Sequence, residues 1–201
     1  MKLYYSPGAC SLAPHIGLHE AGLAFERVLA NLKTHQLEDG TDYYTINPRG
    51  YVPLLELDNG ERLTEVAVIL QYVADLVPDK QLAPAAGTMA RYRLQEWLNF
   101  ISSEVHKGFG PLFNPAMPDA AKKIATEKLL GRLHWVDGQL AGKHYLMGER
   151  FSVADAYFHT VVRWAAGVGL DIGRFGHIAA HKSRVGERPA VRQALQHEGL
   201  A

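Results

Sequence analysis

The sequence predicts a small α/β domain over residues 1–80, a linker over residues 81–87 and an all-helical domain over residues 88–201. Strand and helix patterns alternate in the first part, prolines and glycines then interrupt every period, and only helical periods follow. Alternating strands and helices typically form a sheet covered by helices, whereas helical periods alone indicate a bundle.

The first elements follow a β-α-β order. Leu3–Tyr5 is a short β-rich run that ends at a Pro-Gly pair, so it predicts a strand. A helical pattern follows over Ser11–Ala21, and Gly22 is a plausible stop because glycine readily adopts the left-handed conformation. Alternation over Phe25–Leu29 predicts a second strand, and the polar stretch Lys33–Gly40 is typical of a loop.

A hairpin and a helix complete the first domain. The runs Val52–Leu57 and Glu61–Thr64 flank Asn59 and Gly60, and an Asn-Gly pair between two strand-like runs is a strong hairpin signal. Apolar residues at helical spacing then predict a helix from Val66 to Leu76.

Further helices are expected after the linker, at Met89–Lys107, Ala120–Leu140, Val153–Val168 and Pro189–His197. Ser152 and Asp155 stand three residues apart before the third of these, in a variant of the capping box.

Charge and cysteine content exclude several classes of protein. Lys and Arg number 21 and Asp and Glu number 21, which argues against binding nucleic acid or an anionic membrane by charge. The single cysteine, Cys10, excludes an internal disulfide and a cysteine-rich zinc site. The longest aliphatic run is Val66–Leu70, far below the roughly 20 residues that span a bilayer. We therefore expect a cytoplasmic protein without a metal site.

Cys10 is expected at or just before the amino end of the first helix. Unpaired N–H groups and the helix dipole there stabilise a thiolate, although a free cysteine is also often a plain core residue. The residues alone leave both interpretations open. A two-cysteine exchange cycle is impossible, because Ala13 occupies the second position of a Cys-x-x-Cys motif.

Three other places carry candidate site residues. The bond between Val52 and Pro53 could be cis, although trans X–Pro bonds are far commoner. Glu65 opens a helix, where it could bind a ligand ammonium or, more simply, stabilise the helix dipole.

Asn99, Ser103 and His106 fall within a sector of about 60° on an ideal helix. His106 in such a sector could donate a proton or partner a thiol near neutral pH, although a polar sector is more often a solvated face. His177 and His181 are four residues apart, but no partner adjoins them and we assign them no role.

Taken together, these segments resemble the beta class of bacterial glutathione S-transferases along the whole chain. The segments that carry the resemblance are KLYYSPGACSL at 2–12, NPRGYVP at 47–53, LTE at 63–65, EWLN at 96–99, EVHKG at 104–108 and FSVADA at 151–156. The resemblance implies a thioredoxin-like α/β domain (βαβ, loop or helix, ββα) before an all-α domain, usually as a homodimer.

The resemblance also implies residue roles. Cys10 would lie at the glutathione sulfur and form a mixed disulfide with it. A cis bond before Pro53 would let Val52 pair with the cysteinyl backbone of glutathione. Glu65 and the N–H of Val66 would hold the γ-glutamyl end. The helical domain would contribute Asn99, Ser103 and His106, and Glu104 would reach the ligand of the neighbouring subunit.

Two positions depart from the pattern of the class. His35 stands where lysine commonly faces the glycine carboxylate, and Val66 stands where a small or hydroxyl residue is common. Both departures bear on glutathione affinity and not on the fold.

The leading hypothesis is an enzyme that conjugates the glutathione thiol, as co-substrate, to small hydrophobic electrophiles, without a permanently bound cofactor. Two alternatives remain, a glutathione-dependent monothiol disulfide oxidoreductase and a non-catalytic binder of apolar ligands. The candidate walls of the apolar site are Tyr4, Tyr5, Phe109, Leu112, Phe113 and Trp164.

Overall fold

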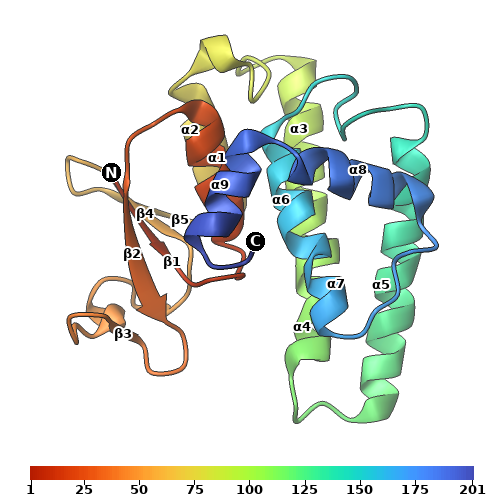
Figure 1. Cartoon of the computed structure of the whole chain (residues 1–201), viewed down its shortest axis with the longest axis horizontal. Helices are drawn as coiled ribbons and strands as arrows, with labels where there is room; N and C mark the ends of the chain where they lie inside the picture. The colour runs from red at the N-terminus through yellow and green to blue at the C-terminus, as the bar shows by residue number, and fades with distance from the viewer. The chain divides into compact units, whose positions relative to one another are not determined.

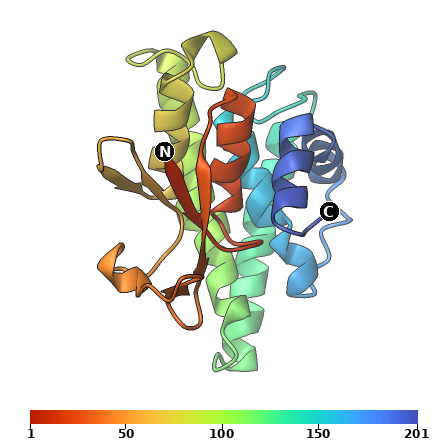
Figure 2. The same cartoon turned by 60° about the vertical axis from the view of Figure 1, so that its left-hand side comes forward.

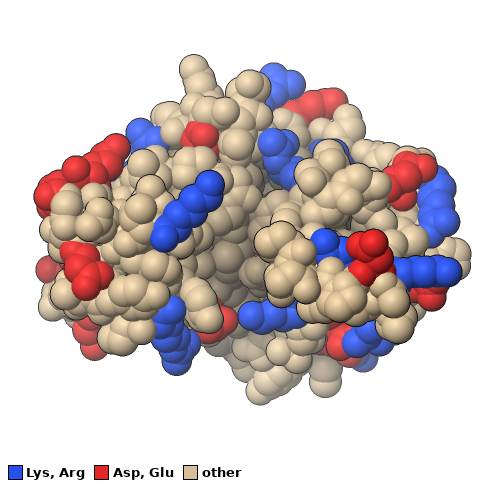
Figure 3. All heavy atoms as spheres, turned by 90° about the horizontal axis from the view of Figure 1, so that it is seen from below, with Lys and Arg blue, Asp and Glu red and all other residues tan.

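The computed structural model describes residues 1–201, which form two compact units (Figure 1). Unit 1 comprises Met1–Leu82 and Arg188–Ala201, and unit 2 comprises Ala83–Glu187. None of the helices is both long and apolar enough for a membrane crossing. Acidic and basic side chains are interspersed on the face that Figure 3 shows.

Unit 1 contains a five-stranded sheet with the strand order β3-β2-β1-β4-β5. Its strands are β1 (Lys2–Tyr5), β2 (Glu26–Asn31), β3 (Gln36–Leu37), β4 (Leu54–Glu56) and β5 (Arg62–Thr64). Strands β1 and β2 are parallel and flank helix α1 (Leu12–Ala21), whereas every other neighbouring pair is antiparallel. Helix α2 (Val66–Asp75) follows β5. The predicted β-α-β, loop, ββ, α order is confirmed, and β3 is an addition inside the expected loop because two residues show no alternation.

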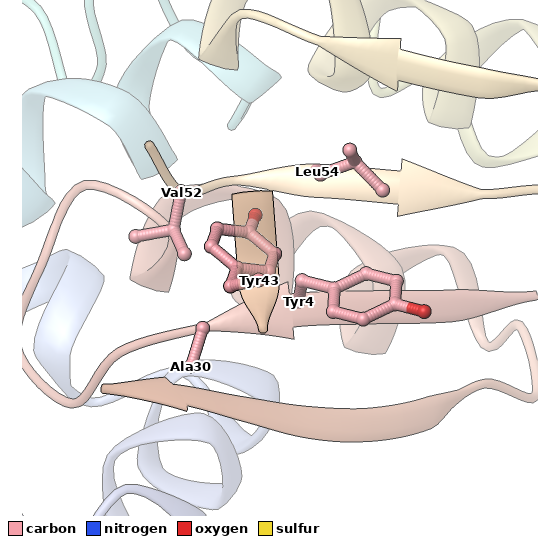
Figure 4. Packing of buried hydrophobic residues seen from close by; sticks show 5 residues of the cluster. All are labelled: Tyr4, Ala30, Tyr43, Val52 and Leu54. Atoms are coloured by element: carbon pink, nitrogen blue, oxygen red, sulfur yellow. The ribbon is translucent and has the colours of Figure 1, made fainter. Parts of the chain in front are cut away.

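Both faces of the sheet are buried. One face carries the cluster Tyr4, Ala30, Tyr43, Val52 and Leu54 (Figure 4). Tyr43 comes from the short helix η1 (Tyr43–Thr45), and its ring centroid lies 5.8 Å from that of Tyr4. Leu3 and Leu55 pair in register on the opposite face and are fully buried. This packing fixes the position of Val52 at the entry to β4.

The C-terminal helix α9 (Pro189–His197) belongs to unit 1, whereas the sequence analysis assigned residues 88–201 to the helical domain. Helix α9 lies beside α1 (Figures 1 and 2). Arg188 donates to both carboxylate oxygens of Glu20, at 2.5 and 2.7 Å. A contact between opposite ends of the chain leaves no periodic signal, so the sequence could not indicate it. Because α9 covers it, α1 is buried on nearly every side.

Unit 2 is entirely helical, as predicted. Its elements are α3 (Met89–Phe100), the π-helical segment η3 (Ile101–His106), α4 (Lys107–Phe113), α5 (Asp119–Leu140), α6 (Val153–Val162), α7 (Trp164–Gly167) and α8 (Gly176–Gly186). The expected single helix Met89–Lys107 is thus three consecutive elements. The expected helix Val153–Val168 divides at Arg163, and α8 was not predicted. Helix η2 (Pro78–Lys80) directly precedes the predicted linker.

Candidate functional site

Cys10 lies in the turn between β1 and α1 and is half-buried. Its thiol donates a hydrogen bond to the carbonyl oxygen of Val52 at 3.3 Å. The turn is closed by the Ser11 hydroxyl oxygen, which accepts the N–H of Ser6 at 3.1 Å. The sulfur therefore lies at the amino end of α1, as predicted, and it contacts a carbonyl that only a protonated thiol can use as an acceptor.

The segment before β4 is held by side chains. The carbonyl oxygen of Tyr51 accepts the Tyr43 hydroxyl at 2.8 Å and the Asn47 amide at 2.7 Å. The Val52–Pro53 peptide bond is cis, as the family resemblance implies, whereas X–Pro frequencies alone favoured trans. Tyr43 and Asn47, which donate to the Tyr51 carbonyl, were not predicted as site residues. Their hydrogen bonds hold the backbone next to Val52, whose carbonyl Cys10 contacts.

Helix α2 begins in an unusual conformation. Glu65 precedes it with φ of 69° and ψ of 120°, a region that non-glycine residues rarely adopt. Such a conformation costs of the order of 1–3 kcal/mol, and backbone strain of this kind clusters at functional sites. The exposed Glu65 carboxylate lies 3.3 Å from Nη1 of Arg49. Val66 buries its side chain, so it offers a ligand only the N–H at the start of the helix.

His35 is packed against its neighbours. Its ring centroid lies 4.4 Å from that of Tyr44, and its Nδ1 is buried without a hydrogen-bond partner. Gly50 has a φ of 68°, and a Cβ there would approach the His35 ring to 3.0 Å and Tyr44 to 2.7 Å. The imidazole is thus held close to the backbone and cannot extend toward a ligand as a lysine side chain could.

His106 in unit 2 is surrounded by aromatic residues. Its Nδ1 lies 2.7 Å from the Tyr157 hydroxyl, and its ring centroid lies 4.9 Å from that of Trp164. Burial, with a smaller contribution from Lys107, lowers the pKa of His106 to about 4. The imidazole is therefore neutral at pH 7, and its role beside a thiol stays a prediction. A neutral imidazole still forms hydrogen bonds at either nitrogen.

The other polar candidates of unit 2 span the junction of α3 with the π-helical segment η3, and not one regular α-helix as expected. The prediction assumed 100° per residue, but the π-helical segment η3 widens the turn between Asn99 and His106. The exposed Ser103 donates its hydroxyl to the Asn99 carbonyl at 3.0 Å. Glu104 accepts from Nε of Arg132 at 2.7 Å, and this bond lowers the pKa of the carboxyl group. Glu104 is thus already paired within its own unit.

The apolar candidates of unit 2 form one cluster beside His106. The ring of Trp164 lies 5.7 Å from Phe109 and 5.5 Å from Phe113, and Phe113 is half exposed. Leu112 is half-buried on the same helix, α4. In unit 1, Tyr5 packs its ring against His15 at 5.9 Å. Tyr4 is a core residue and not a wall of a site.

Sequence reasoning missed a hollow of about 580 Å³ within unit 2. Its lining includes the rings of Trp97, Phe100 and Trp135, with centroids 4.7 to 6.1 Å apart. The spacing of Trp97 and Phe100, three residues apart on a helix, is the signal that could have indicated an aromatic surface there. None of the predicted site residues lines this hollow.

Comparisons with known proteins identify the family. Residues 8–76 match the N-terminal domain of glutathione S-transferases, and residues 100–189 match their C-terminal domain. The chain is 48% identical to glutathione S-transferase GstA of Escherichia coli O157:H7, over the whole of both chains. This chain belongs to the glutathione S-transferase family. The transferase fold predicted from the sequence is confirmed with it.

Solved structures of glutathione S-transferases match the whole chain. The ternary complex of BphK, a bacterial enzyme of this family, is 55% identical and superposes with a TM-score of 0.98 over all of both chains. The beta-class enzyme of Sphingomonas chungbukensis is 48% identical with a TM-score of 0.96, again over all of both chains. A sphingomonad glutathione S-transferase complexed with glutathione is 49% identical, with the same TM-score and coverage. The beta-class resemblance is therefore confirmed, and the chain is an enzyme of this family.

Proposed function

We propose that this transferase joins the thiol of glutathione to small hydrophobic electrophiles. The observation that carries the proposal is the 3.3 Å hydrogen bond between the Cys10 thiol and the Val52 carbonyl at the entry to β4. Backbone groups at a strand edge pair readily with an extended peptide. A glutathione whose cysteinyl N–H used the same carbonyl would bring its own sulfur beside Cys10. The sphingomonad relative, solved with glutathione, supports this choice of co-substrate.

The opposite end of glutathione carries an ammonium and a carboxylate, which suit the start of α2. Glu65 supplies a carboxylate for the ammonium, while Arg49 and the N–H of Val66 suit the carboxylate. The residue left to contact the glycine carboxylate of glutathione is His35, and its packing against Tyr44 limits how far its ring can extend toward a ligand. We therefore assign the binding energy mainly to the γ-glutamyl end.

Conjugation forms a bond between the glutathione sulfur and an electrophilic carbon, while the leaving group departs with its electron pair and the thiol proton passes to solvent. The reaction needs a sulfur stabilised as a thiolate by nearby donors. We assign that role to Asn99, Ser103 and a neutral His106. The candidate contacts for the electrophile are Tyr5 of unit 1 and Phe109, Leu112, Phe113 and Trp164 of unit 2. Glu104 is kept as a candidate contact with the neighbouring subunit's ligand, in competition with Arg132. The proposed working form is a cytoplasmic homodimer.

The second candidate is a monothiol disulfide oxidoreductase. It is favoured by the half-buried, free Cys10 at the amino end of α1, because glutathione could supply the second thiol of an exchange cycle. Assays of the purified protein with glutathione plus a chlorinated aromatic, and with a glutathione mixed disulfide, distinguish the two. Release of chloride with formation of a thioether supports the transferase. Turnover of the mixed disulfide alone would replace it with the oxidoreductase, and binding without turnover would leave only an apolar binder.

A further inference from the structure

Three histidines of unit 1 meet where the two ends of the chain pack together. His15 and His19 are one turn apart on α1, and His197 is the last residue of α9. Their ring centroids are 5.0 Å apart for His15 and His19, 5.2 Å for His19 and His197, and 5.8 Å for His15 and His197. The centroids of the three rings therefore form a nearly equilateral triangle. The position of Cys10 at the amino end of α1 does not depend on this arrangement.

Each of the three rings has a ring nitrogen available as a ligand atom. One ligand nitrogen from each histidine lies within 4.8 Å of the other two. The buried nitrogens without a hydrogen-bond partner include Nε2 of His15, Nε2 of His19 and Nδ1 of His197. His15 is completely buried, so leaving its Nε2 without a partner is costly. A ligand that accepts three nitrogen lone pairs would satisfy all three atoms together.

We propose that His15, His19 and His197 bind one divalent transition-metal ion of the zinc type, with water as the fourth ligand. Imidazole nitrogens are ligands that suit Zn²⁺, Co²⁺ and Ni²⁺. Two ligands of a tetrahedral centre with bonds of 2.0–2.1 Å lie about 3.4 Å apart. The ligand nitrogens, which lie within 4.8 Å of one another, must therefore approach by up to about 1.4 Å. His19 and His197 are partly exposed, which gives them room to rotate and gives the ion a path from solvent.

Glu198 supplies the outer contact that such sites usually have. Its Oε1 lies 2.7 Å from Nδ1 of His15, and both side chains are fully buried. A carboxylate on the far nitrogen fixes the ring with Nε2 facing the metal and raises its basicity as a ligand. Arg27 also contacts the end of α9, where its Nη1 donates to the His197 carbonyl oxygen at 2.9 Å. Phe25 packs edge-on against His15 and His19, forming an apolar wall.

The bound ion would connect the ends of the chain to the turn that carries Cys10. The second oxygen of Glu198, Oε2, accepts the N–H of Gly8 at 2.9 Å. Gly8 stands two residues before Cys10 and adopts a left-handed conformation with φ of 73°. Metal binding would thus cross-link α1 to α9 and hold the Gly8 turn through the same carboxylate.

Titration of the tag-free protein with Co²⁺ alone tests the proposal, because tetrahedral Co²⁺ absorbs visible light. The native chain should bind one Co²⁺ per chain, and added Zn²⁺ should displace it and raise the Tm. His19→Gln and His197→Gln should each weaken Co²⁺ binding by more than the roughly 10–100-fold typical of losing an outer-shell partner. His19 and His197 are partly exposed, so these variants should fold, whereas His15→Gln would also disturb the fully buried contact with Glu198.

Two matched controls accompany the titration. His177→Gln makes the same change at an exposed histidine of unit 2 and should leave Co²⁺ affinity unchanged. Cys10→Ser should keep the visible band, which separates the site from binding at the thiolate. No Co²⁺ binding by the native chain at millimolar concentration would overturn the proposal. It would equally be overturned if His19→Gln and His197→Gln bound Co²⁺ as tightly as the native chain.

Discussion

The Cys10 thiol donates to the Val52 carbonyl oxygen at 3.3 Å, although 42 residues separate the two in the sequence. The bond joins the turn before α1 to the entry of β4, the two backbone segments of unit 1 that we assign to the glutathione thiol. Because the protein sulfur already uses this carbonyl, a bound glutathione would share it or displace the thiol. Either arrangement brings the two sulfurs close together.

This proximity predicts a mixed disulfide. In the presence of oxidised glutathione, the Cys10 thiolate should attack one sulfur of the disulfide and release one reduced glutathione. Mass spectrometry should show one added glutathione per native chain and none on Cys10→Ser. A native chain that remains unmodified after prolonged incubation would contradict the assignment.

Cys10 and His106 should differ in the reactions they affect. Disulfide exchange needs the protein sulfur itself, so Cys10→Ala should abolish exchange and only reduce conjugation, whose thiolate comes from glutathione. His106→Ala should weaken both reactions, because it removes a hydrogen-bonding ring that packs on Trp164. Tyr157→Phe keeps the imidazole but removes its 2.7 Å partner, so it should have a smaller effect. Complete loss of conjugation in Cys10→Ala would refute this division.

Glu65 should determine affinity for the γ-glutamyl end. Glu65→Gln removes the charge proposed to face a ligand ammonium and also the charge of the ion pair with Arg49, at 3.3 Å. We expect binding of S-methylglutathione, which cannot ionise at sulfur, to weaken by about tenfold, which corresponds to about 1.4 kcal/mol. Isothermal titration calorimetry measures the affinity. Glu127→Gln, an exposed change on α5, is the control, and equal affinities of the two variants would exclude the role of Glu65.

Local signals made most of the fold predictable. The Asn-Gly hairpin, the stop of α1 at Gly22 and the helical character of unit 2 each depend on neighbouring residues, and the structure has them, although two of the expected helices are divided. The placement of α9 on α1 was not predictable, because it depends on contacts such as that between Arg188 and Glu20, 168 residues apart.

The candidate site was predictable only where a motif carried it. Cys10, Pro53 and Glu65 stand in segments that resemble the family, and the structure gives Pro53 a cis bond and Glu65 a positive φ. The pairing of Glu104 with Arg132 was not visible, since it joins two helices. The histidine triangle was also hidden, because His197 lies far from α1 in sequence and only packing brings it there.

Asp155 should be one of the most sensitive positions for stability. It is fully buried and accepts four hydrogen bonds of 2.8–2.9 Å, from the N–H of Leu146, the N–H and hydroxyl of Ser152, and His181. Asp155→Ala leaves these donors unpaired, and we expect it to lower the free energy of unfolding by about 3–5 kcal/mol. Ser152→Ala loses a single cap hydroxyl and should cost about 1 kcal/mol. Urea unfolding of both variants measures the difference, and similar losses would contradict the proposed role of Asp155.

Acid should destabilise the chain partly through His159. Burial, with smaller contributions from Arg163, His181 and Lys182, lowers the pKa of His159 to about 3. Between pH 6.5 and pH 3 this histidine is protonated in the unfolded chain but neutral in the folded chain. The free energy of unfolding therefore carries no penalty from His159 above pH 6.5 and falls as the pH drops below that value. At pH 5.0 the loss from one such histidine is about 2 kcal/mol.

His159→Leu removes the titrating group while filling a similar volume. Urea unfolding at pH 7.5 and pH 5.0 should therefore show a loss of stability between the two pH values that is about 2 kcal/mol smaller in His159→Leu than in the native chain. Because each protein is compared with itself, any general effect of the substitution cancels. Equal losses in the two proteins would mean that His159 does not contribute to the acid sensitivity.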